Sequence, residues 1–197
     1  MTDKEKHLKD LEKFFDTDGV KRSLIKISLY LFFYEMLRNS VVDKIRDFYD
    51  IGWDREKGDI ISKTYTDKIV NRKIDGKQNI FLSSLYWLEE NGAITKDEVT
   101  EITSIREFRN DVAHRVDKIL FDSEFNIDAN QENRVLELIK KLEMWWIREV
   151  EIPTYDLDNN EIPDSEIIPG KEIVYTYIKN ISNDILKMID EKKGKQE

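Results

Sequence analysis

The sequence contains no cysteine and only two histidines in 197 residues. The absence of cysteine excludes a disulfide framework, a thiolate nucleophile and a cysteine zinc site. Two histidines are too few for a histidine-rich metal site. We therefore predict no metal and no other cofactor, and this composition fits a reducing compartment.

Proline and glycine are also scarce, with three and seven residues. Few positions therefore interrupt a helical backbone, and the abundant Lys, Glu, Leu and Ile side chains lose little rotamer freedom in a helix. Hydrophobic residues make up 40% of the chain and include nine Phe, eight Tyr and four Trp, which is enough to close a core. The composition predicts an all-α fold.

Long apolar runs are absent as well. No stretch approaches the roughly 18 apolar residues of a membrane-spanning helix, and the first ten residues lack the apolar region of a signal peptide. The net charge of −9 argues against wholesale coating of nucleic acid, because phosphate contacts need clustered Lys and Arg. We expect a cytoplasmic protein with no membrane partner, in which any nucleic-acid chemistry is local.

Apolar residues recur at intervals of three and four along most of the chain, which indicates amphipathic helices. The stretch 20–49 is the most apolar and is predicted to form the central helix. Asn91-Gly92 is a strong helix stop, and Thr95 with Glu98 has the pattern of a capping box at the next helix start. The predicted helices are 2–15, 20–49, 64–72, 79–90, 95–118, 130–150 and 171–189.

An acidic segment separates the last helix from the others. All three prolines lie in 151–170, which has six Asp and Glu residues and no Lys or Arg. This composition predicts an extended connector. The chain then divides into a helical domain at 1–150, the acidic connector at 151–170, and a C-terminal helix with a polar tail at 171–197, which packs on the body or on a partner.

Arg109 interrupts an apolar seam on the predicted helix 95–118. Its neighbours on the seam have heptad-like spacing: Ile102, Ile105, Val112 and Val116. An arginine there is costly unless its guanidinium reaches water, a carboxylate or a phosphate. Two interpretations are open: a structural ion pair or outward-reaching side chain, and a phosphate-binding role.

His114 lies five residues after Arg109, so the two side chains point about 140° apart on a helix. A polar stripe of Arg106, Asn110 and His114 runs beside the seam. We expect one subunit alone to leave the seam exposed. If two copies cross at a two-fold axis, two Arg109 and two His114 side chains meet in one cleft. The alternative is that His114 is an ordinary surface histidine.

The stretch Ile105–His114 resembles the Arg-x4–6-His signature of HEPN domains, helical-bundle proteins often found in bacterial toxin–antitoxin and phage-defence systems. The match includes the polar residue after the arginine, Asn110, and the wider stretch 85–116 is similar to the family. The resemblance implies a HEPN-like helical bundle over about 20–150. It also implies a homodimeric, metal-independent endoribonuclease with an RNA substrate and an antitoxin or defence-system partner.

The resemblance assigns a role to each residue of the motif. His114 transfers protons and Arg109 stabilises the charge that develops on phosphate oxygens. Asn110 orients the histidine or the phosphate. The 2′-OH of RNA is the nucleophile, so the products are a 2′,3′-cyclic phosphate and a 5′-hydroxyl. The basic residues expected to hold the RNA backbone are Arg106, Arg115 and Lys118.

A second function class stays open. Some HEPN domains are non-catalytic dimerisation or nucleotide- and RNA-binding modules, and the acidity of this chain supports that alternative. Where one branch of the family carries a modifiable Tyr two residues after the histidine, this sequence has Val116. The Trp145-Trp146 pair offers ring faces for bases, but at least one ring is expected in the core.

Overall fold

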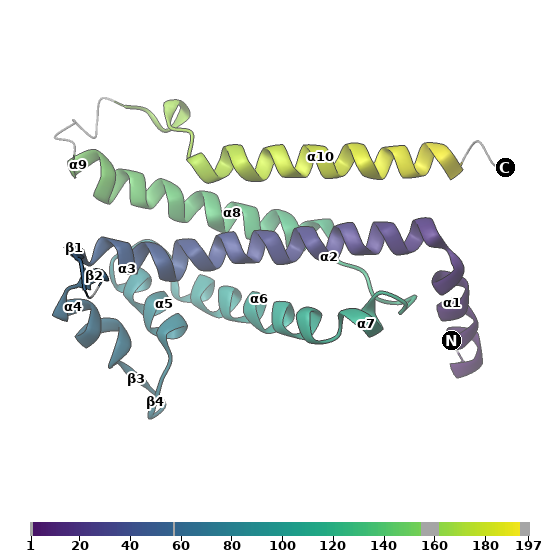
Figure 1. Ribbon diagram of the computed structural model, residues 1–197, viewed down its shortest axis with the longest axis horizontal. Coiled ribbons are helices and arrows are strands. Elements are labelled where there is room, and N and C mark those ends of the chain that lie inside the picture. The colour runs from purple at the N-terminus through teal and green to yellow at the C-terminus, as the bar shows by residue number, and fades with distance from the viewer. Residues whose placement is uncertain (1, 57, 155–161, 194–197) are drawn as a thin grey trace.

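The computed structural model describes residues 2–56, 58–154 and 162–193. The long helices α2 (Thr17–Arg38), α8 (Ala129–Trp146) and α10 (Gly170–Lys193) lie side by side along the longest axis, with α6 (Lys96–His114) packed on α2 (Figure 1). The shorter helices are α1 (Asp3–Phe15), α3 (Lys44–Phe48), α4 (Lys63–Tyr65), α5 (Ile80–Glu90), α7 (Val116–Ile119) and α9 (Ile152–Thr154). The predicted all-α class is confirmed.

The central helix predicted over 20–49 is formed by α2, a π-helical turn at Asn39–Asp43, and α3. The helices α1, α6, α8 and α10 all contact α2. A helix enclosed on several sides buries apolar residues around much of its circumference and not along one stripe. Its buried side chains are Ile27, Leu29, Tyr30, Phe33, Tyr34 and Leu37.

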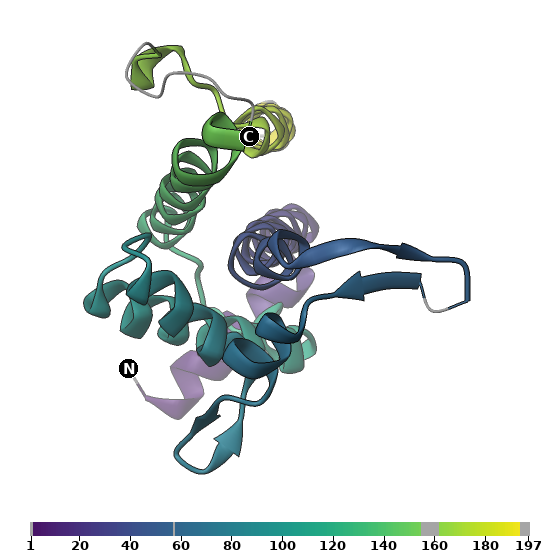
Figure 2. The same cartoon turned by 90° about the vertical axis from the view of Figure 1, so that its left-hand side faces the viewer.

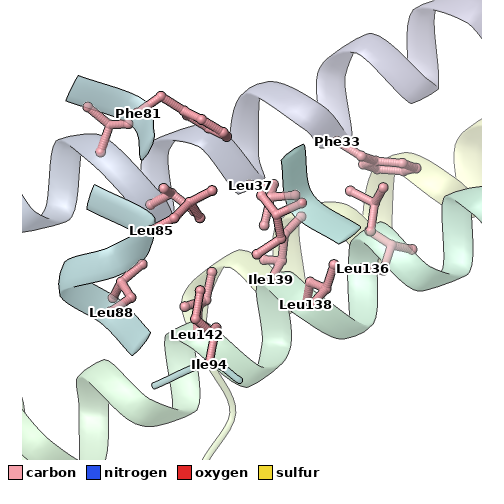
Figure 3. Packing of buried hydrophobic residues seen from close by; sticks show 14 of the residues in the cluster. Phe33, Leu37, Phe81, Leu85, Leu88, Ile94, Leu136, Leu138, Ile139 and Leu142 are labelled. Atoms are coloured by element: carbon pink, nitrogen blue, oxygen red, sulfur yellow. The ribbon is translucent and has the colours of Figure 1, made fainter. Parts of the chain in front are cut away.

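The core lies where α2, α5 and α8 meet (Figure 3). Leu37 of α2 is fully buried, as are Leu85 of α5 and Ile139 of α8. Each such side chain contributes roughly 1.5–3 kcal/mol through burial of apolar surface. These contacts hold α2 against α5 and α8.

The helix ends around α5 and α6 follow the sequence signals. Gly92 has φ of 77°, a left-handed conformation that glycine adopts without strain, and α5 ends two residues earlier. The Glu98 N–H donates to Thr95 Oγ1 at 3.3 Å, and the Thr95 N–H donates to Glu98 Oε2 at 2.8 Å. Both predictions are confirmed.

Two small hairpins occupy the region between α3 and α5. Strands β1 (Asp50–Asp54) and β2 (Gly58–Ile61) pair antiparallel and project from the helical body (Figure 2). Strands β3 (Lys73–Ile74) and β4 (Lys77–Gln78) flank an Asp-Gly turn, with positive φ at both turn residues as in tight hairpins. The helix predicted at 64–72 is α4 with a π-helical turn at Thr66–Val70. The hairpins were not predicted.

The helix predicted over 95–118 is shorter than expected. It ends at His114, because Arg115 leaves the helical conformation with φ of −126° and ψ of 19°. The helix α7 then starts in a new direction and brings Ile119, which is 2% exposed, into the core. Burial of Ile119 therefore accounts for the break that places His114 at a helix end.

The acidic segment 151–170 departs from an extended connector at its start. Glu151 ends a π-helical turn at Ile147–Glu151, and α9 follows directly. The part at 155–161 lies outside the described residues. Carboxylates on both sides of it pair with the body, since Glu151 lies 3.4 Å from Lys44 and Asp164 accepts from Arg148 Nε at 3.0 Å. The C-terminal helix α10 packs on α2 and α8 of the same chain.

A buried carboxylate links three parts of the bundle. Glu143 of α8 is 5% exposed and accepts a hydrogen bond from Ser40 Oγ at 2.8 Å. The ammonium groups of Lys44 and Lys171 each lie 3.0 Å from its oxygens. Burial alone raises the pKa of Glu143, but the two lysines outweigh burial and hold that pKa below its usual range.

Acid should therefore weaken the fold through Glu143. Because its pKa is lower in the folded than in the unfolded chain, its stabilising effect is present above the unfolded value of about 4.3 and is lost as the pH falls through the folded value. The variant Glu143→Gln should lower the free energy of unfolding at pH 7 by about 3 kcal/mol and reduce the acid dependence. Urea denaturation between pH 7 and pH 3 measures both.

The exposed Glu137 on the same helix provides the control. Glu137→Gln should change neither the free energy of unfolding at pH 7 nor its decrease between pH 7 and pH 3 by more than about 0.5 kcal/mol. An unchanged acid dependence in Glu143→Gln would contradict the assignment.

Candidate functional site

Arg109 lies on the side of α6 that faces α2. Its Nη2 donates to a carboxylate oxygen of Glu35, and its Nη1 donates to Asn110 Oδ1 at 3.2 Å. Its Cζ lies 5.1 Å from the ring centroid of Tyr34, which is the geometry of a cation–π contact. Three neighbours therefore fix the orientation of a guanidinium whose side chain is 31% exposed.

The seam around Arg109 faces the core of its own chain. Ile102 and Val112 are fully buried, and Ile105 and Val116 pack against the same cluster. The expectation that one subunit would leave this seam exposed was wrong, because α2 and its neighbours already cover it. Glu35 is the carboxylate on a neighbouring helix that the ion-pair interpretation required.

One hydrogen-bond donor of Arg109 is unused. Its Nε is buried and has no hydrogen-bond partner within the described ranges. Tyr34 is 3% exposed, and burial raises the pKa of its hydroxyl despite the opposing effect of Arg106 and Arg109. The Tyr34 hydroxyl is thus protonated at neutral pH and remains a hydrogen-bond donor.

Arg106 lies one turn before Asn110 but points to a different neighbour. Its Cζ lies 4.7 Å from the ring centroid of Phe81 on α5. Together with Tyr34 and Arg38 it lines a cleft of about 560 Å³. Tyr34, which contacts Arg109, therefore also lines the cleft that contains Arg106.

The other predicted residues, His114, Arg115 and Lys118, lie at the end of α6 or shortly after it. His114 is exposed, and none of the described residues forms a hydrogen bond or ion pair with it. Arg115 pairs with Asp111 at 3.1 Å on the surface, and Lys118 is exposed on α7. Within one chain, Asn110 contacts Arg109, whereas none of the described contacts joins His114 to either residue.

Three residues near Arg109 were not predicted: Tyr34 and Glu35, which contact it, and Arg38, which lines the cleft. They lie on one turn of α2, inside the most apolar stretch of the sequence. The only charged residues from Leu24 to Leu37 are Lys26 and Glu35. A carboxylate in such a run is the signal that would have indicated a partner for Arg109.

The tryptophan pair belongs mainly to the core. Trp146 is 3% exposed, and its Nε1 donates to the Ser40 carbonyl oxygen at 3.3 Å. Trp145 is half-buried and lies edge-on to Trp87, with ring centroids 6.1 Å apart. The prediction that at least one of the two rings packs in the core is confirmed.

Comparisons of the chain with protein-family models, curated protein sequences and solved structures found no match. In the part of the chain that the structure describes, no helix has the length and hydropathy needed to span a bilayer. The same residues include no group of three or more His, Asp or Glu side chains placed to hold a metal ion. We therefore infer function from the residues around Arg109 and His114.

The Arg109–Glu35 pair should contribute little to stability. The side chains are 31% and 48% exposed, and ion pairs of that exposure typically contribute about 0.2–1 kcal/mol. A double-mutant cycle with Arg109→Gln and Glu35→Gln, followed by urea denaturation, should give a coupling energy in this range.

The bidentate pair of Arg134 with Glu101, with both N–O distances 2.7 Å, is the reference and should couple more strongly. A coupling energy above about 2 kcal/mol for Arg109–Glu35 would indicate that Arg109 is a structural residue.

Proposed function

We propose that the protein is a HEPN-like endoribonuclease that works as a homodimer and cleaves RNA without a metal ion. The observation that carries this proposal is that one helix has both a half-buried, oriented Arg109 and, at its end, an exposed His114. Attack of a 2′-OH on the adjacent phosphate leaves a 2′,3′-cyclic phosphate and a 5′-hydroxyl. The cellular context that fits is a cytoplasmic toxin–antitoxin or phage-defence system.

Arg109 is suited to stabilise the phosphate group in the transition state. Tyr34 and Asn110 hold its guanidinium from two sides, so little reorganisation is needed when charge develops. Glu35 is nearly half exposed, and a phosphate with two acceptor oxygens can replace its carboxylate. Glu35 then keeps the guanidinium aligned until RNA arrives.

His114 supplies the proton transfers in this proposal. Imidazole is the side chain that exchanges protons most readily near neutral pH. One His114 takes the proton of the 2′-OH as its oxygen bonds to phosphorus. The bond to the 5′-oxygen then breaks, and that oxygen receives a proton from a protonated imidazole.

The directions of the two side chains support a homodimer. Arg109 faces α2, while His114 is exposed at the end of α6 and about 140° away around the helix. A second copy that places its α6 end against the first would bring His114 of one subunit to Arg109 of the other. Arg115 and Lys118 flank that meeting point and would hold the RNA backbone.

A non-catalytic dimerisation or RNA-binding module is the second candidate. The observation that favours it is the ion pair itself, because Glu35 neutralises Arg109 in the free chain. In that case Arg109 serves the α2–α6 contact, and His114 is an ordinary surface residue.

Cleavage assays separate the two candidates. Wild-type protein should cleave single-stranded RNA equally fast with and without EDTA, because no step needs a metal. His114→Ala should lower the rate by about 10²–10⁴. Arg109→Ala should remove transition-state stabilisation of about 3–4 kcal/mol. Time courses with mapping of the product ends measure these effects.

The other histidine, His7 on α1, gives the matched control, and His7→Ala should cleave like wild type. Equal rates for His114→Ala and wild type would exclude His114 from catalysis. If no tested RNA is cleaved by the wild-type protein, the binding module becomes the better account.

A further inference from the structure

The cleft beside Arg109 lies between α2, α5, α6 and the turn at Thr66–Val70. Its volume of about 560 Å³ is within the range of small-molecule sites and is large enough for one nucleotide. None of its lining residues is acidic, although the chain has a net charge of −9. The lining residues used below are Tyr34, Arg38, Tyr65, Gln78, Phe81 and Arg106.

Two guanidinium groups give the cleft its positive charge. Arg106 packs on the ring of Phe81, and no carboxylate in the described ranges forms an ion pair with it. Arg38 has one long contact of 3.5 Å with Asp43, in which both side chains are more than 40% exposed. Each guanidinium has five N–H donors, so most of the donors in this cleft are available to an anion.

Three buried aromatic side chains contribute to the apolar lining of the cleft. Tyr34 and Tyr65 are 3% and 8% exposed, and burial raises the pKa of both hydroxyls, which stay neutral donors. Phe81 adds a third ring, and the amide of Gln78 adds polar groups at the rim. Aromatic side chains combined with cations are typical of sites that bind unpaired bases.

We propose that this cleft binds one nucleotide of a single-stranded RNA, with the base against the aromatic lining and the phosphate on Arg38 and Arg106. Tyr34 indicates where this nucleotide lies along the strand, because the Tyr34 ring contacts the Arg109 guanidinium and also lines the cleft. The bound nucleotide is the neighbour of the one that Arg109 holds. The identification of the ligand as RNA next to the cleaved bond rests on the proposed function.

Binding of a labelled, short 2′-O-methyl oligonucleotide tests the assignment, since this strand lacks the nucleophile and cannot be cleaved. Fluorescence anisotropy over a range of salt concentrations should show affinity about tenfold weaker for Arg38→Gln and for Arg106→Gln. Each variant should also lower the slope of log affinity against log salt by about 0.7, the value for one phosphate contact on a single strand.

Arg72 is the matched control for Arg106. Its Cζ lies 5.2 Å from the ring centroid of Tyr86, and its guanidinium donates to Glu90 at 2.8 Å and 3.2 Å. Arg72→Gln therefore removes the same charge and the same kind of ring contact outside the cleft, from an arginine that a carboxylate already neutralises. This variant should bind like wild type. Equal losses for Arg72→Gln and Arg106→Gln, or no binding by the wild-type protein at low salt, would overturn the proposal.

Photo-crosslinking locates the base directly. The same oligonucleotide with 4-thiouridine should crosslink to Tyr34, Tyr65 or Phe81, and crosslinks confined to other parts of the chain would overturn the proposal. His7→Ala should keep wild-type affinity. If the wild-type protein binds through Arg38 and Arg106 but cleaves no RNA, the nuclease proposal fails alone. If the cleft variants bind and cleave like wild type, the cleft assignment fails alone.

Discussion

Enclosure of α2 is the constraint on which the rest of the structure depends. The helices α1, α6, α8 and α10 contact it, so its apolar side chains are buried around much of the helix. Polar residues on such a helix need partners, and Tyr34 and Glu35 contact Arg109 on α6. The same packing that closes the core therefore orients Arg109 and places it beside the cleft.

The sequence predicts features that depend on local contacts. The capping box at Thr95 and the stop at Gly92 involve residues a few positions apart, and both are confirmed. The break after His114 was not predicted, because it depends on burial of Ile119 against distant helices. For the same reason Arg109 could be selected as a candidate from the seam, whereas its partner Glu35 lies 74 residues away and had only one signal, a carboxylate within an apolar run.

The distribution of charge supports our proposal that RNA binds only at the cleft and at Arg109. Six of the acidic residues lie in 151–170, and two of them, Glu151 and Asp164, pair with Lys44 and Arg148 of the body. The lining of the cleft includes Arg38 and Arg106 and no carboxylate. A strand that enters the cleft would meet two available cations and then Arg109, whose carboxylate partner is weakly held. We expect weak binding to duplexes, because their paired bases cannot reach the rings.

The composite site is the central claim, and subunit mixing tests it most directly. His114→Ala and Arg109→Ala are each expected to be inactive, but a mixed dimer joins the intact Arg109 of one subunit to the intact His114 of the other. Equal amounts of the two variants, mixed under conditions that allow subunit exchange, should regain RNA cleavage up to about a quarter of the wild-type rate. A mixture in which dimers exchange subunits and cleavage stays at the level of the separate variants would contradict a site shared between subunits.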